Sequence, residues 1–346
     1  MEIEKYSDCL EYLVKSKRDL NLLMGNGFSM AYDSQIFSYN VLQNFLESLS
    51  DPLLTSLFEI VETKNLEIIM RQLGLFARML EVFSEDDELK EKIKHADTLL
   101  KKGLIDAVKK LHPEHVFTIP EKKMQACYEF LAPYLSETGN LFTTNYDILL
   151  YWVLMRSECS INIDGFGRER ENSDEYVPED ELVFSELIWG PNSENQNVHY
   201  VHGALHLFDN GIDIEKESYD SSQYLLQNIE KRMEKMEYPV FVTGGDGNNK
   251  LSQIMHNKYL TFCYEKLSGI TGSLVTFGFN FGPYDEHIID AINSAALHGR
   301  KAKNKLHSIY IGIFSADDER YIRSIEKKFK CKVRIYHSKS VNIWGH

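Results

Sequence analysis

The sequence predicts an α/β fold: a Rossmann-like, doubly wound, mostly parallel sheet with a large helical insertion after the first strand. Three features of the chain carry this prediction. Short apolar runs alternate with amphipathic segments through the C-terminal third, which is typical of parallel strands joined by helices. A glycine-rich turn follows the first apolar run at residues 25–29. Residues 41–135 show almost only helical spacing of apolar side chains.

The expected elements follow in chain order. The apolar run 19–24 is the first strand, and Leu42, Phe45 and Leu49 open the helical pattern of the insertion. Strands are then expected at 140–144, 159–163, 198–201, 238–243, 273–277, 307–314 and 332–336, and helices at 147–155, 224–236, 250–267, 285–297 and 317–329. The charged stretch 168–181 is expected to be a loop. We therefore expect one Rossmann-like domain, residues 1–40 and 136–346, interrupted by the insertion 41–135.

Composition and charge exclude several classes of protein. A content of 43% hydrophobic and 26% charged residues is ordinary for a globular chain and argues against disorder. The 52 acidic and 38 basic residues give a net charge of −14, which disfavours direct nucleic-acid binding and broad binding to anionic membranes. No apolar run is long enough for a membrane span, and no signal peptide is evident. The five cysteines form no CxxC pair, so we expect a cytoplasmic protein without a zinc or disulfide framework.

The turn at Gly25, Asn26, Gly27, Phe28 and Ser29 is the first candidate site. Glycines at this place let the backbone approach a phosphate, and a helix that starts there favours negative charge. The match to the dinucleotide fingerprint is partial, and an ordinary strand-to-helix turn explains the same residues equally well. The acidic residue that a dehydrogenase needs at the next strand end is absent, which counts against hydride transfer.

Polar side chains crowd the end of the strand at 140–144. Thr144, Asn145 and Asp147 follow one another there within a Thr-Thr-Asn-Tyr-Asp sequence. Their ordinary role would be to cap the next helix. Because ligand crevices of such sheets lie beyond the carboxyl ends of the strands, these residues are also candidates for a binding or catalytic site.

His202 is the candidate general base, since it follows an apolar strand and precedes Gly203. A hydrogen-bonded core histidine is the alternative. His199 and His206 flank it, so a metal site is a further possibility. Gly203 stands where the glutamate of an HExxH motif would be and the segment has the pattern of a strand and turn, so no metal is expected.

The segment 278–287 follows another buried strand. Gly278 and Asn280 could hold a ribose or an adenine through backbone amides and the side-chain amide. The segment could equally be a turn in which Asp285 caps the next helix.

Taken in order along the chain, these pieces resemble the sirtuin superfamily. The turn 25–29 is similar to the first phosphate-binding turn, residues 143–147 to the Thr-Gln-Asn-Ile-Asp segment, and His202-Gly203 to the catalytic His-Gly. Residues 278–285 resemble the later glycine turn. The four zinc cysteines of the deacetylases are missing, since residues 204–237 contain no cysteine, and 238–245 lacks the Phe-Gly-Glu sequence. The chain looks most like the bacterial sirtuin-like proteins of antiviral defence.

This resemblance implies an NAD⁺ glycohydrolase that cleaves NAD to nicotinamide and ADP-ribose, acting as the toxic effector of abortive infection. It implies Asn145 and His202 as catalytic residues, and NAD contacts from the turns and from Thr144 and Asp147. It also implies a homo-oligomer and an activating partner, of which a HerA-type ATPase is one candidate. A non-catalytic sensor of NAD or ADP-ribose and a zinc-independent deacylase are the alternatives.

Overall fold

Two sheets organise the chain in the computed structural model. It describes residues 3–34, 52, 56, 59–60, 66–113, 115–136, 138–157, 161–169, 184–218, 224–235, 237–242, 247–297 and 305–345. The larger sheet contains β1 (Glu4–Lys5), β2 (Leu20–Met24), β3 (Asn140–Thr143), β6 (Val198–Tyr200), β10 (Gly272–Phe277), β11 (Leu306–Ile313) and β12 (Lys332–His337). The smaller sheet contains β4 (Phe166–Gly167), β5 (Ile188–Trp189), β7 (Gly203–Asp209), β8 (Ile214–Lys216) and β9 (Pro239–Phe241).

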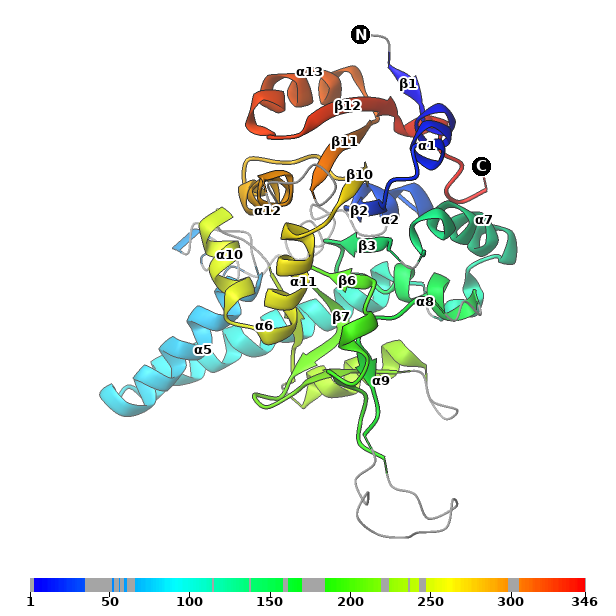
Figure 1. Cartoon of the computed structure of the whole chain (residues 1–346). Coiled ribbons are helices and arrows are strands. Elements are labelled where there is room, and N and C mark those ends of the chain that lie inside the picture. Colours follow the sequence, from blue (N-terminus) through cyan, green and yellow to red (C-terminus); the bar gives the residue numbers. More distant parts are fainter. Residues whose placement is uncertain are drawn as a thin grey trace, which may run out of the picture.

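The helices surround these sheets (Figure 1). They are α1 (Tyr6–Lys15), α2 (Gly27–Tyr32), α5 (Leu66–Phe83), α6 (Asp87–Leu111), α7 (Glu121–Leu131), α8 (Leu149–Arg156), α9 (Leu225–Glu234), α10 (Gly247–Met255), α11 (Lys258–Ser268), α12 (Glu286–Leu297) and α13 (Ala316–Ile325). Figure 1 shows α10, α11 and α12 on one side of the larger sheet and α7 and α8 on the other. Within the described ranges, no helix is long and apolar enough to cross a membrane.

The larger sheet is entirely parallel, with the strand order β6-β3-β2-β10-β11-β12-β1. The predicted α/β class and parallel sheet are therefore confirmed. After β1 at one edge, the chain enters the middle of the sheet at β2, moves outward through β3 to β6, and returns to β10 on the other side of β2. The first six strands of this order match the 3-2-1-4-5-6 order of dinucleotide-binding sheets. The order reverses between β2 and β10, and such a reversal leaves a crevice at the carboxyl ends of the two strands.

The central strands are buried on both faces, as parallel strands between two helix layers must be. All five residues of β2 and all six of β10 are buried. The one amide inside β2, Asn21, donates hydrogen bonds to the carbonyls of Thr271 (2.8 Å) and Ser273 (3.2 Å). Its burial therefore leaves no donor unpaired, and the amide ties β2 to the start of β10.

The smaller sheet is antiparallel, and the sequence pattern did not predict it. The strand expected at 238–243 exists as β9, but it pairs with β7 in this second sheet. The helix expected at 250–267 is two helices, because the Asn257 side chain accepts hydrogen bonds from the Tyr259 and Leu260 N–H groups and starts α11. The strand expected at 159–163 is wrong over 161–163, which form no strand; 158–160 and most of the loop 168–181 lie outside the described residues.

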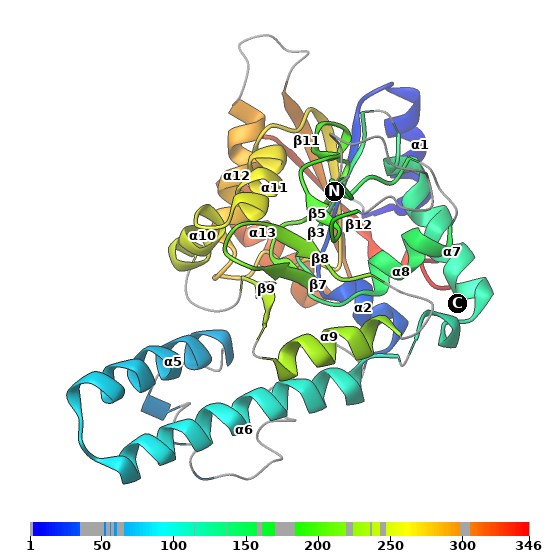
Figure 2. The ribbon, with the colours of Figure 1, turned by 90° about the horizontal axis from the view of Figure 1, so that it is seen from below.

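Helices α5 and α6 form a hairpin that extends away from the sheets (Figure 2). Figure 2 also shows α6 running beside α9, and the two helices are in contact. Helix α7 lies closer to the sheet and buries Met124, Cys127, Phe130 and Leu131 in the same hydrophobic core. Most of the insertion before residue 66 lies outside the described residues. The boundaries 41 and 135 of the insertion stay predictions.

Replacing Gly27 with alanine is expected to lower the free energy of unfolding by about 2 kcal/mol, as overpacked sites do. A Cβ on Gly27 would lie 2.5 Å from the Cα of Gly278, and backbone on both sides prevents relief. Gly269→Ala is the control, since the nearest atom to its Cβ would be 3.4 Å away. Urea unfolding of both variants measures the effect. Equal stability of the two variants would contradict the proposed close contact.

Candidate functional site

Two glycine loops meet where the strand order of the larger sheet reverses. The first glycine loop, residues 25–29, follows β2, and the second glycine loop, residues 278–285, follows β10. The Gly25 N–H donates to the Phe277 carbonyl (3.0 Å), and the Gly27 N–H donates to the Gly278 carbonyl (2.9 Å). A Cβ on Gly25 would lie 2.6 Å from the Gly278 carbonyl oxygen. The glycines therefore allow one loop to lie directly against the other. Because both of their N–H groups are engaged, a phosphate bound here would have to be recognised by other donors.

A buried polar network lies beside these loops. The Asn145 amide donates to Ser29 Oγ (2.9 Å), and the Ser29 hydroxyl donates to Asp147 Oδ2 (2.5 Å). The three residues are 8%, 0% and 3% exposed, respectively. Asp147 Oδ1 also accepts the Leu149 N–H (2.9 Å) at the start of α8. The structure thus joins three of the predicted site residues, from the first glycine turn and from the end of β3.

Burial raises the pKa of the Asp147 carboxyl from 3.8 to about 6, against the hydrogen bonds from Ser29 and Leu149, which lower it. The desolvation of a carboxylate outweighs two hydrogen bonds at this site. The carboxyl is therefore close to half protonated in mildly acid solution.

His202 lies at the same sheet edge as Asn145. Strand β6 is the parallel neighbour of β3, and their carboxyl ends meet where the Val201 N–H donates to the Thr143 carbonyl (2.9 Å). Asn145 and His202 follow these two strand ends. The adjacent strands therefore bring the two predicted catalytic residues to one edge of the sheet.

A second histidine contacts His202. The Nε2 atoms of His202 and His287 are 2.8 Å apart, and the rings stack with centroids separated by 5.1 Å. His202 is 3% exposed and His287 is 1% exposed. His287 stands near the start of α12, which follows the second glycine loop. It was not predicted as a site residue, although it is the last residue of the segment 278–287 that the sequence singled out.

A positive charge lies close to this histidine pair. Lys250 of α10 donates to Asp285 Oδ1 (2.8 Å), with both side chains mostly buried. Burial, His287 and Lys250 together hold the pKa of His202 well below its ordinary value. Burial, with Lys250 second, lowers the pKa of His287 to about 3. Both rings are consequently neutral at pH 7. Asp285 bonds Lys250, an ion pair that the sequence did not predict.

The backbone conformation after His202 requires a glycine at position 203. Its φ is +77°, and a Cβ there would lie 1.9 Å from the Val240 carbonyl oxygen. Only glycine fits this conformation and this contact. The His-Gly pair therefore places His202 where the chain leaves the larger sheet and enters β7 of the smaller one.

The remaining predicted residues belong neither to the polar network of Ser29, Asn145 and Asp147 nor to the His202–His287 pair. Phe28 is 1% exposed and packs against Trp344, so it is part of the core. Thr144 Oγ1 donates to the Met24 carbonyl (3.3 Å), which ties β3 to β2. Asn26 and Gly278 are half-buried, and Asn280 is exposed.

The two histidines that flank His202 lie in other surroundings. His199 stacks on Phe142 and bonds Gln196 at 3.2 Å. His206 is fully buried and stacks on Tyr151, and among the described residues neither of its ring nitrogens has a hydrogen-bond partner. In the described part of the chain, no group of three His, Cys, Asp or Glu side chains could hold a metal ion.

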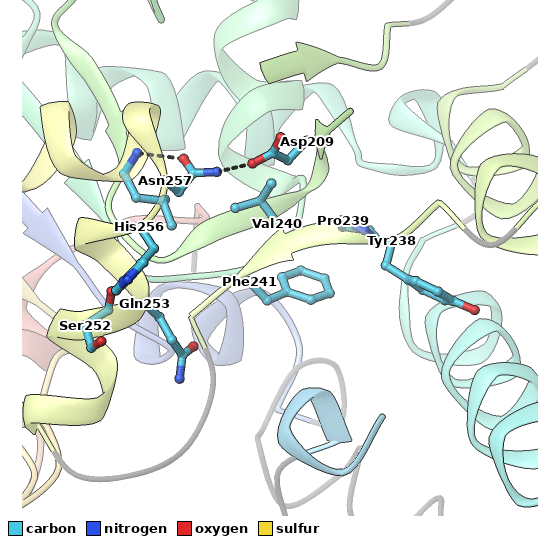
Figure 3. A pocket seen from close by; sticks show the side chains of 10 residues that line it. Asp209, Tyr238, Pro239, Val240, Phe241, Ser252, Gln253, His256 and Asn257 are labelled. Carbon is cyan, nitrogen blue, oxygen red and sulfur yellow. Dashed lines mark hydrogen bonds between the residues drawn. The ribbon is translucent and has the colours of Figure 1, made fainter. Parts of the chain in front are cut away.

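A cavity of about 410 Å³ is present in the described part of the chain, and none of the predicted site residues lines it (Figure 3). It lies between β9 and the helices α10 and α11, and Figure 3 shows the Asn257 amide directed at the Asp209 carboxylate on its border. The cavity is lined by Asp209, Tyr238, Pro239, Val240, Phe241, Ser252, Gln253, His256, Asn257 and Leu260. Two of the elements that line it also contact the site: the Val242 N–H after β9 donates to the His202 carbonyl, and α10 carries Lys250.

Replacing Asp147 with asparagine is expected to raise the free energy of unfolding at pH 8 by about 1 kcal/mol. A carboxyl whose pKa is raised in the folded state destabilises that state above its pKa, and the penalty disappears as the pH falls through about 6. Asparagine has no charge to desolvate. Urea unfolding at pH 8 and pH 5.5 measures the difference.

Asp318→Asn provides the control for this prediction. Asp318 is half-buried in the capping box of α13, so its loss should lower stability at pH 8. A loss of stability in Asp147→Asn at pH 8 would contradict the account of the buried carboxyl.

The comparison with known families gives one match. A family described as "Domain of unknown function (DUF4917)" matches residues 22–344, nearly the whole chain. A search for similar curated proteins found no match.

Proposed function

The chain belongs to the DUF4917 family, and we propose that it is an NAD⁺ glycohydrolase that cleaves NAD to nicotinamide and ADP-ribose. One observation carries the proposal: Asn145 and His202 follow adjacent strands of a sheet that has the dinucleotide-binding order, beside its reversal point. The sirtuin-like order of motifs gives the class of substrate.

The chemistry needs little beyond positioning and one proton acceptor. Breaking the bond between nicotinamide and ribose develops positive charge on the ribose and releases a neutral base. The Asn145 amide donates to Ser29 and has further capacity to hold a ribose hydroxyl or the attacking water. His202, neutral at pH 7, accepts the proton from that water or from a ribose hydroxyl.

The buried network supports this arrangement. Ser29 accepts a hydrogen bond from the Asn145 amide and donates one to Asp147, so the side chain that holds the amide is itself anchored to a buried carboxyl. Side chains fixed in this way keep a reacting group in position without further ordering when substrate binds. Lys250, which forms an ion pair with Asp285, lies near His202. It supplies a cation for the pyrophosphate of NAD in a chain whose net charge is −14.

The cellular role follows from the same resemblance. The proposed protein is a cytoplasmic toxic effector of a bacterial anti-phage system, without direct binding to membranes or nucleic acid. An active NADase would harm its host, so a homo-oligomer or a partner such as a HerA-type ATPase restrains or activates it.

A non-catalytic sensor of NAD or ADP-ribose is the second candidate. One observation favours it: the N–H groups of Gly25 and Gly27 are engaged with the second glycine loop rather than open to a ligand. Such a sensor would bind the nucleotide by other contacts and leave it intact.

Product analysis separates these functions. Purified protein is incubated with NAD, and nicotinamide and ADP-ribose are quantified by chromatography while binding is measured by calorimetry. An NADase gives equal amounts of both products. Calorimetric binding without products would contradict the proposal and support the sensor, and deacylation of an acylated peptide would support the deacylase.

A further inference from the structure

The side chain of His287 contacts the proposed base, His202, from a different element of the fold. Its ring comes from α12, whereas His202 connects β6 and β7. The two Nε2 atoms are 2.8 Å apart, which is hydrogen-bond distance. One proton lies between them, so one ring must donate from Nε2 and the other must accept at Nε2. The protonation of each ring therefore fixes that of the other.

This bond is the single polar contact that the described residues give the His287 ring. Its Nδ1 atom is buried and has no hydrogen-bond partner. The residue is otherwise held by its backbone, whose carbonyl accepts the Tyr264 hydroxyl (2.9 Å). An apolar side chain would fill this buried place without leaving a nitrogen unpaired. The imidazole at position 287 therefore requires an explanation, and its one partner is His202.

The bond also restricts how His202 can work. With Nε2 directed at His287, a substrate proton can reach His202 only at Nδ1. Nδ1 accepts a proton only if His202 carries its own proton at Nε2 and donates it to His287. The opposite arrangement would leave His202 with a protonated Nδ1 and no accepting nitrogen toward the substrate.

We propose that His287 is a positioning residue for His202, an inference that rests on the proposed NADase activity. His287 accepts the His202 Nε2–H bond and so keeps His202 Nδ1 free to accept. When water or a ribose hydroxyl gives its proton to His202 Nδ1, the Nε2 proton shifts to His287 Nε2. The positive charge then resides on His287. The proton returns along the same path and leaves to solvent, since the hydrolysis of NAD releases one proton.

The neighbouring charges keep this cation short-lived. Lys250 opposes a second positive charge on either ring, and Asp285, which is bonded to Lys250, offsets it in part. The pair therefore returns to two neutral rings after each turnover, ready to accept the next proton.

Nitrogen-15 NMR of the histidine rings tests the protonation directly, without any activity. The full chain is labelled at histidine, and the spectra of His202→Gln and His287→Leu identify the two rings. We expect His202 to be protonated at Nε2 in the wild type, and to populate both neutral forms in His287→Leu. A wild-type His202 protonated at Nδ1, or unchanged in His287→Leu, would overturn the inference.

Kinetics gives the second measurement. His287→Leu should lower kcat for nicotinamide release about 10²-fold with KM nearly unchanged, and His287→Gln, whose amide oxygen can accept the bond, should recover part of the loss. His206→Phe is the control, because His206 is also buried but stacks on Tyr151, and among the described residues its ring nitrogens form no hydrogen bond. A full rate in His287→Leu overturns the inference. If the wild type releases no nicotinamide, the proposed NADase activity is contradicted. The NMR result alone then decides whether His287 positions His202.

Discussion

Replacing Asn145 with alanine is expected to slow NAD cleavage about 10²- to 10³-fold, the typical cost of losing one positioned donor. His202→Gln, which keeps the size and polarity of the side chain, should cost about 10²- to 10⁴-fold, because no neutral group remains to accept the proton. The folds should survive. Losing the Asn145 bond to Ser29 costs about 1 kcal/mol of stability, as ordinary hydrogen bonds do.

Two control variants separate chemistry from structure. Asn197 bonds the Ile161 carbonyl and the Ile163 N–H immediately before β6, at the opposite end of the strand from His202. Asn197→Ala should therefore lose stability and keep its turnover. His206→Phe should keep both. Nicotinamide release and melting temperature are measured for each variant. Near-normal turnover in His202→Gln, or equal losses in the controls, would contradict the assigned roles.

Acidification is expected to unfold the protein steeply between about pH 5.5 and pH 4. Among the described residues, five histidines are at most 5% exposed: His112, His199, His202, His206 and His287. Burial is the largest cause that lowers the pKa of each. The unfolded chain takes up protons on these rings below about pH 6.5, and the folded chain does not. The free energy of unfolding is therefore at its full value above about pH 6.5, and it decreases as the pH falls below that value.

The expected slope is large. Each buried histidine contributes up to about 1.4 kcal/mol per pH unit, and Asp147, whose pKa is raised, works in the opposite direction. The net change is about 5 kcal/mol per pH unit, enough to exhaust a typical stability within two units.

Urea titrations at several pH values test this dependence. His206→Phe should lower the change in unfolding free energy per pH unit by about 1.4 kcal/mol, the contribution of one buried histidine. The substitution removes no hydrogen bond among the described residues. His337→Phe, at an exposed histidine, should leave it unchanged. A stability that stays constant from pH 7 to pH 4.5 would contradict the neutral buried state of these rings.

The sequence predicted the parallel sheet because its central strands are short, mostly apolar runs between amphipathic helices. Strands such as β2 and β10 carry enough consecutive apolar residues to stand out between helices. The smaller sheet was missed because β4, β5, β8 and β9 have only two or three residues each, too few to show alternation. The break between α10 and α11 was missed because Asn257 caps a helix in the middle of an otherwise continuous helical pattern.

The candidate site was predictable where it lies at strand ends and not where it depends on contacts between distant segments. Asn145, Asp147 and His202 follow apolar strands, which is a signal that the sequence carries. The pairing of Ser29 with Asp147 joins residues 118 positions apart, and that of His202 with His287 joins residues 85 apart. Pairings of this kind come from the strand order and the helix packing. No local pattern contains them.

The account depends most directly on whether the wild-type protein hydrolyses NAD through these two residues. Proton NMR of a single sample resolves NAD, nicotinamide and ADP-ribose as the reaction proceeds. We expect the wild type to convert NAD to equal amounts of the two products, and the Asn145→Ala/His202→Gln double variant to leave NAD intact under the same conditions. Equal conversion by the double variant, or intact NAD with the wild type alone and with its activating partner, would contradict the account.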